Sequence, residues 1–139
     1  MPRKIIIDTN VWISYFINAR ADYLVNWIIE NDITVFTSGK LVTEIKDVLS
    51  RPKFKKQFPY PVSDFVNLHL QVCILIKISE KFTNAPDPDD NFLFDLALKA
   101  NAEFLITSDK LLLSYATEFD LEIITFPKFR ELGINKKSN

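Results

Sequence analysis

Residues 4–10 of the chain read KIIIDTN, three isoleucines followed at once by an acid, a hydroxyl and an amide. The β-branched apolar run predicts a buried strand over residues 4–8. A carboxylate at the end of a buried strand is often functional, so we ask which other carboxylates could lie beside Asp8.

Strand and helix patterns alternate through the rest of the chain. Ser38 is expected to cap the third helix, and Pro52 follows the end of that helix. A further helix begins after Pro61 and ends before the third strand. The remaining predicted strands cover residues 33–38, 74–78, 103–109 and 121–126, and the remaining helices cover residues 11–17, 21–31, 39–50, 87–102 and 111–117.

These elements predict the fold class. Nearly continuous apolar strands that alternate with helices are typical of a parallel sheet covered on both faces, which is a three-layer α/β/α sandwich. In such a sheet the carboxyl ends of the strands share one edge, and sites form where the strand order reverses. We expect one domain over residues 1–133 and a disordered tail over residues 134–139.

Residue counts exclude several kinds of site. Gly39 and Gly133 are the only glycines, too few for a Walker loop or a G-x-G-x-x-G nucleotide turn. His69 is the single histidine and no G-x-S-x-G is present, which disfavours a serine hydrolase. His69 and Cys73, four residues apart, could share a metal but are more typical of a half-buried helix face. The lone cysteine, with no leader and no membrane-length apolar run, favours a cytoplasmic protein.

The charge balance constrains how the chain could bind a polyanion. Its 17 Lys and Arg against 18 Asp and Glu give a formal charge of −1, so bulk basicity cannot hold nucleic acid. The segment RPKFKKQFPY interleaves four cations with aromatic residues and is the candidate for RNA contact. The alternative is a solvated loop whose aromatic rings face the core. The four cations are Arg51, Lys53, Lys55 and Lys56.

Four acids are predicted to meet at one edge of the sheet. Asp8 and Asp109 end two strands, Asp90 opens the helix after the third strand, and Glu44 flanks the apolar stripe of its helix. Each alone could be an ordinary turn or cap residue. Together, like charges need something positive among them, and oxygen ligands without a His and Cys cluster suit Mg²⁺ or Mn²⁺.

The order of the four acids, with DTN at the first strand and TSD at the fourth, resembles that of a PIN domain. The resemblance extends over nearly the whole chain. DPDDNFLFDLA followed by NAEFLITSDKLLL is similar to the branch that includes toxin components of toxin–antitoxin pairs. The resemblance implies a five-stranded parallel sheet, a Mg²⁺ or Mn²⁺ cofactor and hydrolysis of RNA phosphodiester bonds. It also implies the toxin role in a prokaryotic type II pair, with a cognate antitoxin and a homodimer.

The same resemblance implies roles for individual residues. Asp8 and Asp109 would be direct metal ligands, Asp90 a ligand or a water-mediated partner, and Glu44 the acid that orients a metal-bound water. Thr9 or Asn10 would hold the Asp8 loop, and Thr107 or Ser108 the Asp109 turn. Asp89 rivals Asp90 as third ligand, and Asp87 is a less certain participant. Asp95 is either a further ligand or a solvated residue paired with Lys99 on a polar stripe that also holds Asn91.

Three other functions remain open at this point. A phosphatase of the haloacid dehalogenase type also ends its first strand on an Asp, but it needs a second Asp where Asn10 stands. A PIN-like scaffold that only binds RNA or protein usually lacks one or more of the acids, and all four are present. A housekeeping RNA-processing nuclease would share the site but not the toxin role.

Overall fold

The computed structural model describes residues 3–56 and 60–132, so the tail predicted over residues 134–139 lies outside the described residues. Helices and strands alternate as predicted. In chain order they are β1 (Arg3–Ile7), α1 (Thr9–Ile17), α2 (Ala21–Glu30), β2 (Ile33–Thr37), α3 (Gly39–Leu49), α4 (Pro52–Lys55), α5 (Val62–Val72), β3 (Cys73–Leu75), the 3₁₀ turn η1 (Pro88–Asp90), α6 (Asn91–Ala100), β4 (Phe104–Ile106), α7 (Lys110–Leu113), β5 (Glu122–Ile124) and α8 (Phe126–Glu131).

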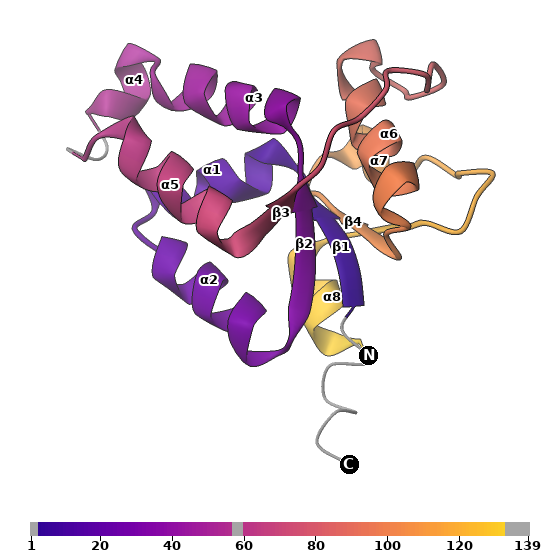
Figure 1. Cartoon of the computed structure of the whole chain (residues 1–139), viewed down its shortest axis with the longest axis horizontal. Coiled ribbons are helices and arrows are strands. Elements are labelled where there is room, and N and C mark those ends of the chain that lie inside the picture. The colour runs from indigo at the N-terminus through magenta and orange to yellow at the C-terminus, as the bar shows by residue number, and fades with distance from the viewer. Residues whose placement is uncertain (1–2, 57–59, 133–139) are drawn as a thin grey trace.

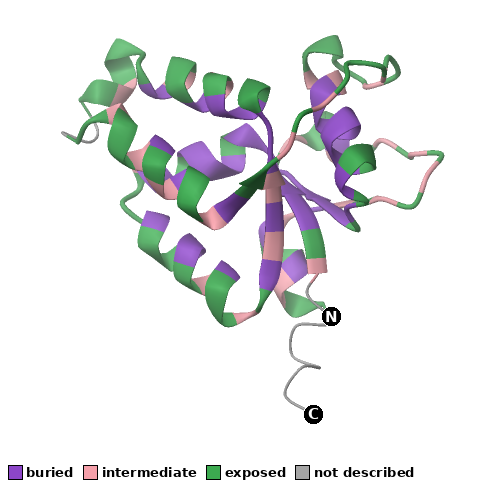
Figure 2. Ribbon diagram, in the orientation of Figure 1, coloured by how far each residue is buried: buried purple, intermediate pink, exposed green. Residues whose placement is uncertain are grey.

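The five strands form one parallel sheet in the order β3-β2-β1-β4-β5. Seen nearly edge-on, the sheet has α1, α2, α3 and α5 on one side and α6 and α7 on the other (Figure 1). The predicted three-layer α/β/α sandwich is therefore confirmed. Ile5, Ile6 and Ile7 are fully buried because β1 is the central strand and helices cover both of its faces (Figure 2).

The strand order reverses between β1 and β4. The chain builds outward from β1 to β2 and β3, and then crosses to place β4 and β5 on the other side of β1. Ile5 accordingly pairs with Val35 of β2 on one side and with Phe104 of β4 on the other. Asp8 and residues 107–109 leave these two adjacent strands at their carboxyl ends, where ligands bind in open α/β sheets.

Several element boundaries differ from the predictions. The third strand covers Cys73–Leu75 instead of residues 74–78, because the chain leaves the sheet after Ile76 donates its N–H to the Thr37 carbonyl. The helix predicted over residues 87–102 is divided into η1 and α6, and it ends where Asn101 adopts a left-handed conformation with φ 52°.

Two helices were not predicted. Helix α4 occupies part of the RPKFKKQFPY segment, for which RNA contact and a solvated loop were the two alternatives, and Pro52 begins this helix as well as following α3. Helix α8 follows the last strand at once, capped by Thr125, whose hydroxyl accepts a hydrogen bond from the Lys128 N–H. In both cases a proline stands in the first turn of the helix, where its missing N–H costs nothing.

A polar group lies buried between α5 and β2. The Nε2 atom of His69 and the Oγ1 atom of Thr37 lie 2.8 Å apart in a hydrogen bond, and the Trp12 ring meets the imidazole edge-on at 4.5 Å. Cys73 Sγ lies 3.9 Å from Nδ1. Burial lowers the pKa of His69 to about 4 and raises the pKa of the Cys73 thiol. The pair that sequence placed on a half-buried helix face is thus fully interior.

Across residues 3–56 and 60–132, none of the helices combines the length and apolar character that crossing a membrane requires.

Candidate functional site

Asp8 and Asp109 are joined through the hydroxyl of Thr107. Asp8 leaves β1 and is only 5% exposed, and its Oδ2 accepts a hydrogen bond from Thr107 Oγ1 at 2.8 Å. The same Oγ1 accepts the N–H of Asp109 at 3.0 Å, and the Asp8 N–H donates to the Ile106 carbonyl at 2.9 Å. Burial is the main reason that the pKa of Asp8 is raised. The Thr107 hydrogen bond opposes the rise and the charge of Asp109 adds to it.

Glu44 reaches the same edge from α3. Leu41 and Ile45 are fully buried beside it, so the helix presents the partly buried Glu44 along the flank of its apolar stripe. Its Oε1 accepts a hydrogen bond of 2.9 Å from the hydroxyl of buried Thr9, the residue after Asp8. Burial is the main cause of its raised pKa. The Thr9 hydrogen bond opposes that rise, while the charge of Asp8 adds to it.

Asp90 is the acid on which the other charges act together. It precedes the first residue of α6, and its side chain makes no cap hydrogen bond. Desolvation, followed by the charges of Asp8, Asp87, Asp109 and Glu44, raises the pKa of Asp90 to about 7. The carboxyl groups of four separate elements are therefore near enough to act on one another.

The donor chemistry of this cluster fits a divalent cation. Carboxylate oxygens are the ligands that Mg²⁺ and Mn²⁺ prefer, and a cation would relieve the repulsion that, after burial, raises the pKa of Asp90. Among the described residues, however, no three His, Cys, Asp or Glu side chains are grouped so that they could hold one ion. Mg²⁺ commonly binds through one or two carboxylates and retains several waters, so it does not require three grouped carboxylates.

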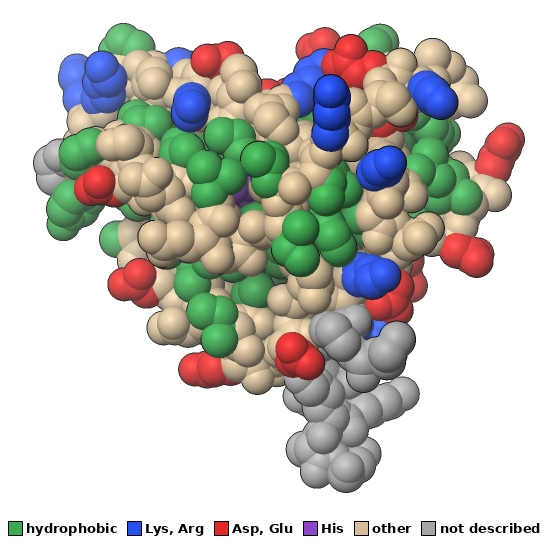
Figure 3. Space-filling model, viewed as in Figure 1, with side chains coloured by type: hydrophobic (Ala, Val, Ile, Leu, Met, Phe, Trp, Pro, Cys, Tyr) green, Lys and Arg blue, Asp and Glu red, His purple; other side chains and the backbone are tan. Residues whose placement is uncertain are grey.

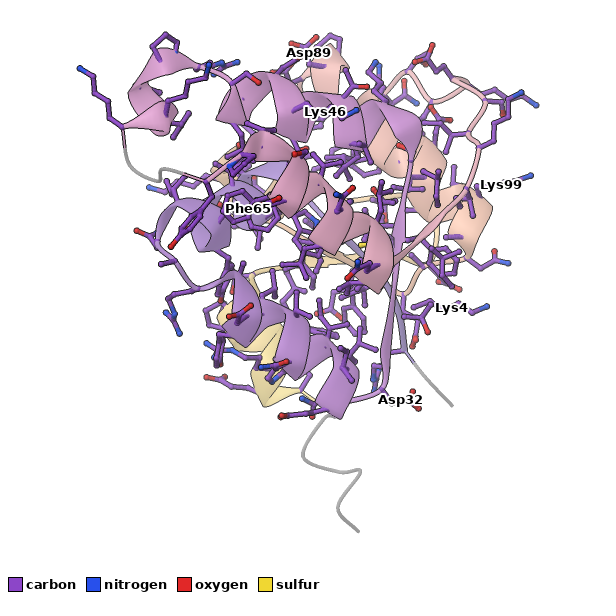
Figure 4. All side chains as sticks on the ribbon, turned by 60° about the vertical axis from the view of Figure 1, so that its left-hand side comes forward. Lys4, Asp32, Lys46, Phe65, Asp89 and Lys99 are labelled. Carbon is purple, nitrogen blue, oxygen red and sulfur yellow. The ribbon has the colours of Figure 1, made fainter. Side chains whose placement is uncertain are left out.

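The remaining predicted site residues lie around the cluster. Asn10 and Ser108 are exposed, so Thr9 and Thr107 provide the hydroxyls that contact the acids. Asp89 is exposed at the edge of the molecule (Figure 4), and its N–H donates to Asp87 Oδ1 at 3.0 Å. Asp87 and Asp89 thus shape the turn before Asp90.

Asp95 differs from the prediction of a solvated residue paired with Lys99. It is 7% exposed, and its Oδ1 accepts the backbone N–H groups of Lys81 at 3.1 Å and Phe82 at 2.9 Å. Lys99 instead points into solvent (Figure 4). The polar-stripe prediction was wrong because the segment after β3 folds over this face of α6. Asn91 also binds that segment, accepting the Ala85 N–H at 3.0 Å.

The double role of Thr107 was not foreseen from the sequence. It was expected only to hold the turn of Asp109, and it also donates to Asp8, which is 99 positions earlier. The adjacency of β1 and β4 is what joins them, and no local sequence pattern encodes that pairing. A signal for Asp95 did exist, because its neighbours in FLFDLALKA are almost all apolar, as in a helix buried on most sides.

The four predicted RNA-contact cations lie on or beside α4. Arg51, Lys53, Lys55 and Lys56 are all exposed, and Lys and Arg side chains colour the upper left of the molecule, where α4 lies (Figure 3). Phe54 packs against the core, with the Lys53 Nζ 4.9 Å from its ring centre. Tyr60 is exposed, and Phe58 lies outside the described residues.

Two comparisons with known proteins bear on this site. A sequence profile described as PIN domain matches residues 4–111, more than half of the chain. The Methanocaldococcus jannaschii protein named Uncharacterized protein MJ1680 is 30% identical over 119 residues, which are 83% of this chain and 76% of that protein. Proteins with a PIN domain are generally nucleases that bind RNA and use divalent metals.

Proposed function

The chain belongs to the PIN domain family, and from that premise we propose that it is a metal-dependent ribonuclease whose site is the cluster of Asp8, Glu44, Asp90 and Asp109. One observation supports this above the others. The carboxyl group of Asp90 lies in the electrostatic field of the other three acids, which come from three other segments of the fold. Such a concentration of like charge at the switch point of the sheet destabilises the protein unless a cation offsets it.

In this proposal Asp8 and Asp109 would hold Mg²⁺ or Mn²⁺ directly, and Asp90 would reach the ion through a bound water. When bound, that ion neutralises the acids and polarises the scissile phosphate, which four bare carboxylates would repel. The chain's own hydrogen bonds set the geometry before the ion arrives, since Thr107 fixes Asp8 relative to the Asp109 turn. Prepared ligands of this kind reduce the reorganisation that binding requires.

Glu44 is the group we assign to the attacking water. Thr9 holds its Oε1, and the raised pKa of this carboxyl makes it a better proton acceptor than an ordinary glutamate. The water oxygen bonds to phosphorus, the bond from phosphorus to the 3′ oxygen breaks, and Glu44 takes the water proton. The leaving 3′ oxygen gains a proton from solvent, so the products carry a 5′-phosphate and a 3′-hydroxyl.

RNA would extend from the cluster along α3 toward α4. Lys46 is exposed on α3 (Figure 4), and Arg51, Lys53 and Lys56 follow at its far end. Cations of this kind contact phosphates and carry little base specificity. Replacing Lys53 and Lys56 together by Ala should therefore raise KM for long RNA more than kcat, with a weaker dependence of binding on salt.

The resemblance of DPDDNFLFDLA and NAEFLITSDKLLL to toxin components favours the toxin role in a type II pair. A cognate antitoxin would then bind the acids through a basic segment, and both proteins would meet RNA in the cytoplasm. A small adjacent gene for a DNA-binding protein that restores growth on co-expression would support this role. Growth unaffected by expression of the chain alone would favour a housekeeping nuclease.

A homodimer is also part of the proposal. Leu70, Ile74 and Leu75 are exposed on and beside β3, the edge strand of the sheet, and exposed apolar side chains at a strand edge favour association. Light scattering of the purified protein should give twice the chain mass, and Ile74→Lys should shift it to one chain mass.

The test of the activity is cleavage of labelled single-stranded RNA with Mg²⁺, Mn²⁺ or EDTA. Asp8→Asn keeps the size of the side chain and removes the charge, and Asp47→Asn removes an exposed acid of α3 as the matched control. We expect the native protein and Asp47→Asn to cut only with metal, and Asp8→Asn not to cut. Cleavage by Asp8→Asn at the native rate would refute the assignment.

A second measurement separates the metal site from the choice of substrate. Calorimetric titration of Mn²⁺ into native protein and Asp8→Asn should show binding only in the native protein. If neither protein binds Mn²⁺, Asp8 is a structural turn residue and the proposed mechanism fails.

A further inference from the structure

Two arginines and two tyrosines gather where α1, α2 and α8 meet, and they share no residue with the carboxylate cluster. Arg20 precedes α2, and its guanidinium carbon lies 4.7 Å from the ring centre of Tyr23 and 5.7 Å from that of Tyr15. The two rings stack with centres 6.1 Å apart and planes 14° from parallel. Arg130 of α8 lies 5.8 Å from the Tyr23 ring centre and donates a hydrogen bond from Nη1 to the Tyr23 hydroxyl. We call these four residues the Arg–Tyr cluster.

The positive charge of this cluster has no carboxylate partner within the described part of the chain. The ion pairs found there are Arg3–Glu103 and Lys40–Glu80, and neither involves Arg20 or Arg130. Asp22 and Glu131 are the acids nearest to them in sequence, and both are exposed and make no ion pair with either arginine. Two guanidinium groups therefore share one corner of the molecule without a compensating acid.

Three further observations show that this corner is electropositive and that one of its hydrogen-bond donors is unpaired. Arg20 occupies the position before the first turn of α2, where the helix dipole adds positive partial charge instead of offsetting it. The Nε of Arg130 is buried and has no hydrogen-bond partner among the described residues, and buried donors of this kind are normally paired. The fields of both arginines also act on the Tyr15 hydroxyl, where each lowers a pKa that burial raises. The guanidinium charges of Arg20 and Arg130 thus act on the same pair of tyrosines.

We propose that the Arg–Tyr cluster binds a phosphate group. One guanidinium fork satisfies one carboxylate, whereas two guanidinium groups from different elements, with two phenol hydroxyls beside them, match the larger number of acceptor oxygens on phosphate. Arg20 is exposed and Tyr23 is 36% exposed, so a ligand can reach them from solvent. The proposal does not depend on the nuclease function.

The chain contains an internal comparison that separates phosphate binding from simple packing of arginine on a ring. Arg3 also lies over an aromatic ring, with its guanidinium carbon 5.5 Å from the centre of Phe104, but Glu103 neutralises it at 3.2 Å. Arg3 stabilises the fold as a paired cation, and Arg20 does not have that pairing. Arg3→Gln and Arg20→Gln are therefore matched variants.

Thermal unfolding with and without inorganic phosphate, in EDTA, tests the proposal. At phosphate tenfold above its dissociation constant, the native protein and Arg3→Gln should gain roughly 5 °C in Tm, while Arg20→Gln should gain almost nothing. Chloride at equal ionic strength serves as the salt control. No phosphate-dependent gain in the native protein, or an equal gain in Arg20→Gln, would overturn the proposal.

The source of the phosphate is distinguished by competition. Phosphorus NMR of inorganic phosphate with native protein should show line broadening that Arg20→Gln lacks. If unphosphorylated single-stranded RNA abolishes the broadening, the site takes backbone phosphodiesters. If only a 5′-phosphorylated mononucleotide abolishes it, the site takes a terminal phosphate. Broadening that persists unchanged in Arg20→Gln contradicts the site under either reading.

Discussion

Protonation of His69 should lower the free energy of unfolding by about 2.5 kcal/mol at pH 4.5, relative to neutral pH. His69 is fully buried, hydrogen-bonded to Thr37, and has its pKa lowered to about 4, against an ordinary value of 6.5 in the unfolded chain. Because the folded state holds the lower pKa, the unfolded state takes up the proton first as the pH falls. Stability is therefore lost from about pH 6.5 downward. The loss reaches about 3 kcal/mol at pH 4 and levels off below that pH at about 3.5 kcal/mol, which is about 1.4 kcal/mol for each unit of the pKa difference.

Urea unfolding at pH 7.5, 6.5, 5.5 and 4.5 would measure this loss, with His69→Gln as the comparison. Glutamine retains a donor and an acceptor for Thr37 but does not titrate, so the variant should lose stability on acidification less steeply than the native protein. The difference between the two curves isolates His69 from the site acids, whose raised pKa values act in the opposite direction. Parallel curves for the two proteins would refute the assignment of the pH dependence to His69.

Three other changes test the site and its supports. Asp90→Asn in EDTA should raise Tm more at pH 8 than at pH 5, because a carboxyl with pKa about 7 is charged in the folded state only at the higher pH; equal shifts at both pH values would contradict the repulsion. Thr107→Val should cost about 1–3 kcal/mol of unfolding free energy by leaving the buried Asp8 without its donor, whereas Thr107→Ser should retain most of it in urea titrations. Asp95→Ala should cost about 2 kcal/mol and accelerate hydrogen exchange at the amides of Lys81 and Phe82, and Asp95→Asn should exchange more slowly than Asp95→Ala. Unchanged exchange in Asp95→Ala would show that the two amides are protected by something else.

The fold could be predicted from sequence because its strands carry a strong local signal. KIIID, ITVFTS and EFLITSD are short, apolar and bounded by polar residues, and each gave a strand near its observed position. The third strand was displaced because ILIKI is apolar beyond the point where pairing with β2 ends. Local composition indicates which residues are buried, but the length of a strand depends on how far the adjacent strand pairs with it.

The outline of the site was predictable for the same reason, and its connections were not. Parallel topology alone places Asp8 and Asp109 on one edge, whatever the strand order. The link through Thr107 requires β1 and β4 to be neighbours, and the burial of Asp95 requires the segment after β3 to lie on α6. Both are tertiary contacts. The apolar neighbours of Asp95 indicate that it is buried, but no local pattern identifies the segment that covers it or the pairing of β1 with β4.

The hydrogen bond between Thr107 and Asp8 joins residues 99 positions apart, so this part of the site can form only late in synthesis of the chain. A ribosome releases the chain from its amino end, and β1 must wait, without its β4 neighbour, until most of the remaining sequence has emerged. Until then Asp8 has neither the hydroxyl that fixes it nor Asp90 and Asp109 beside it. A growing chain that carries only its first acids therefore lacks the assembled cluster of carboxylates while it is still tethered to its own messenger RNA.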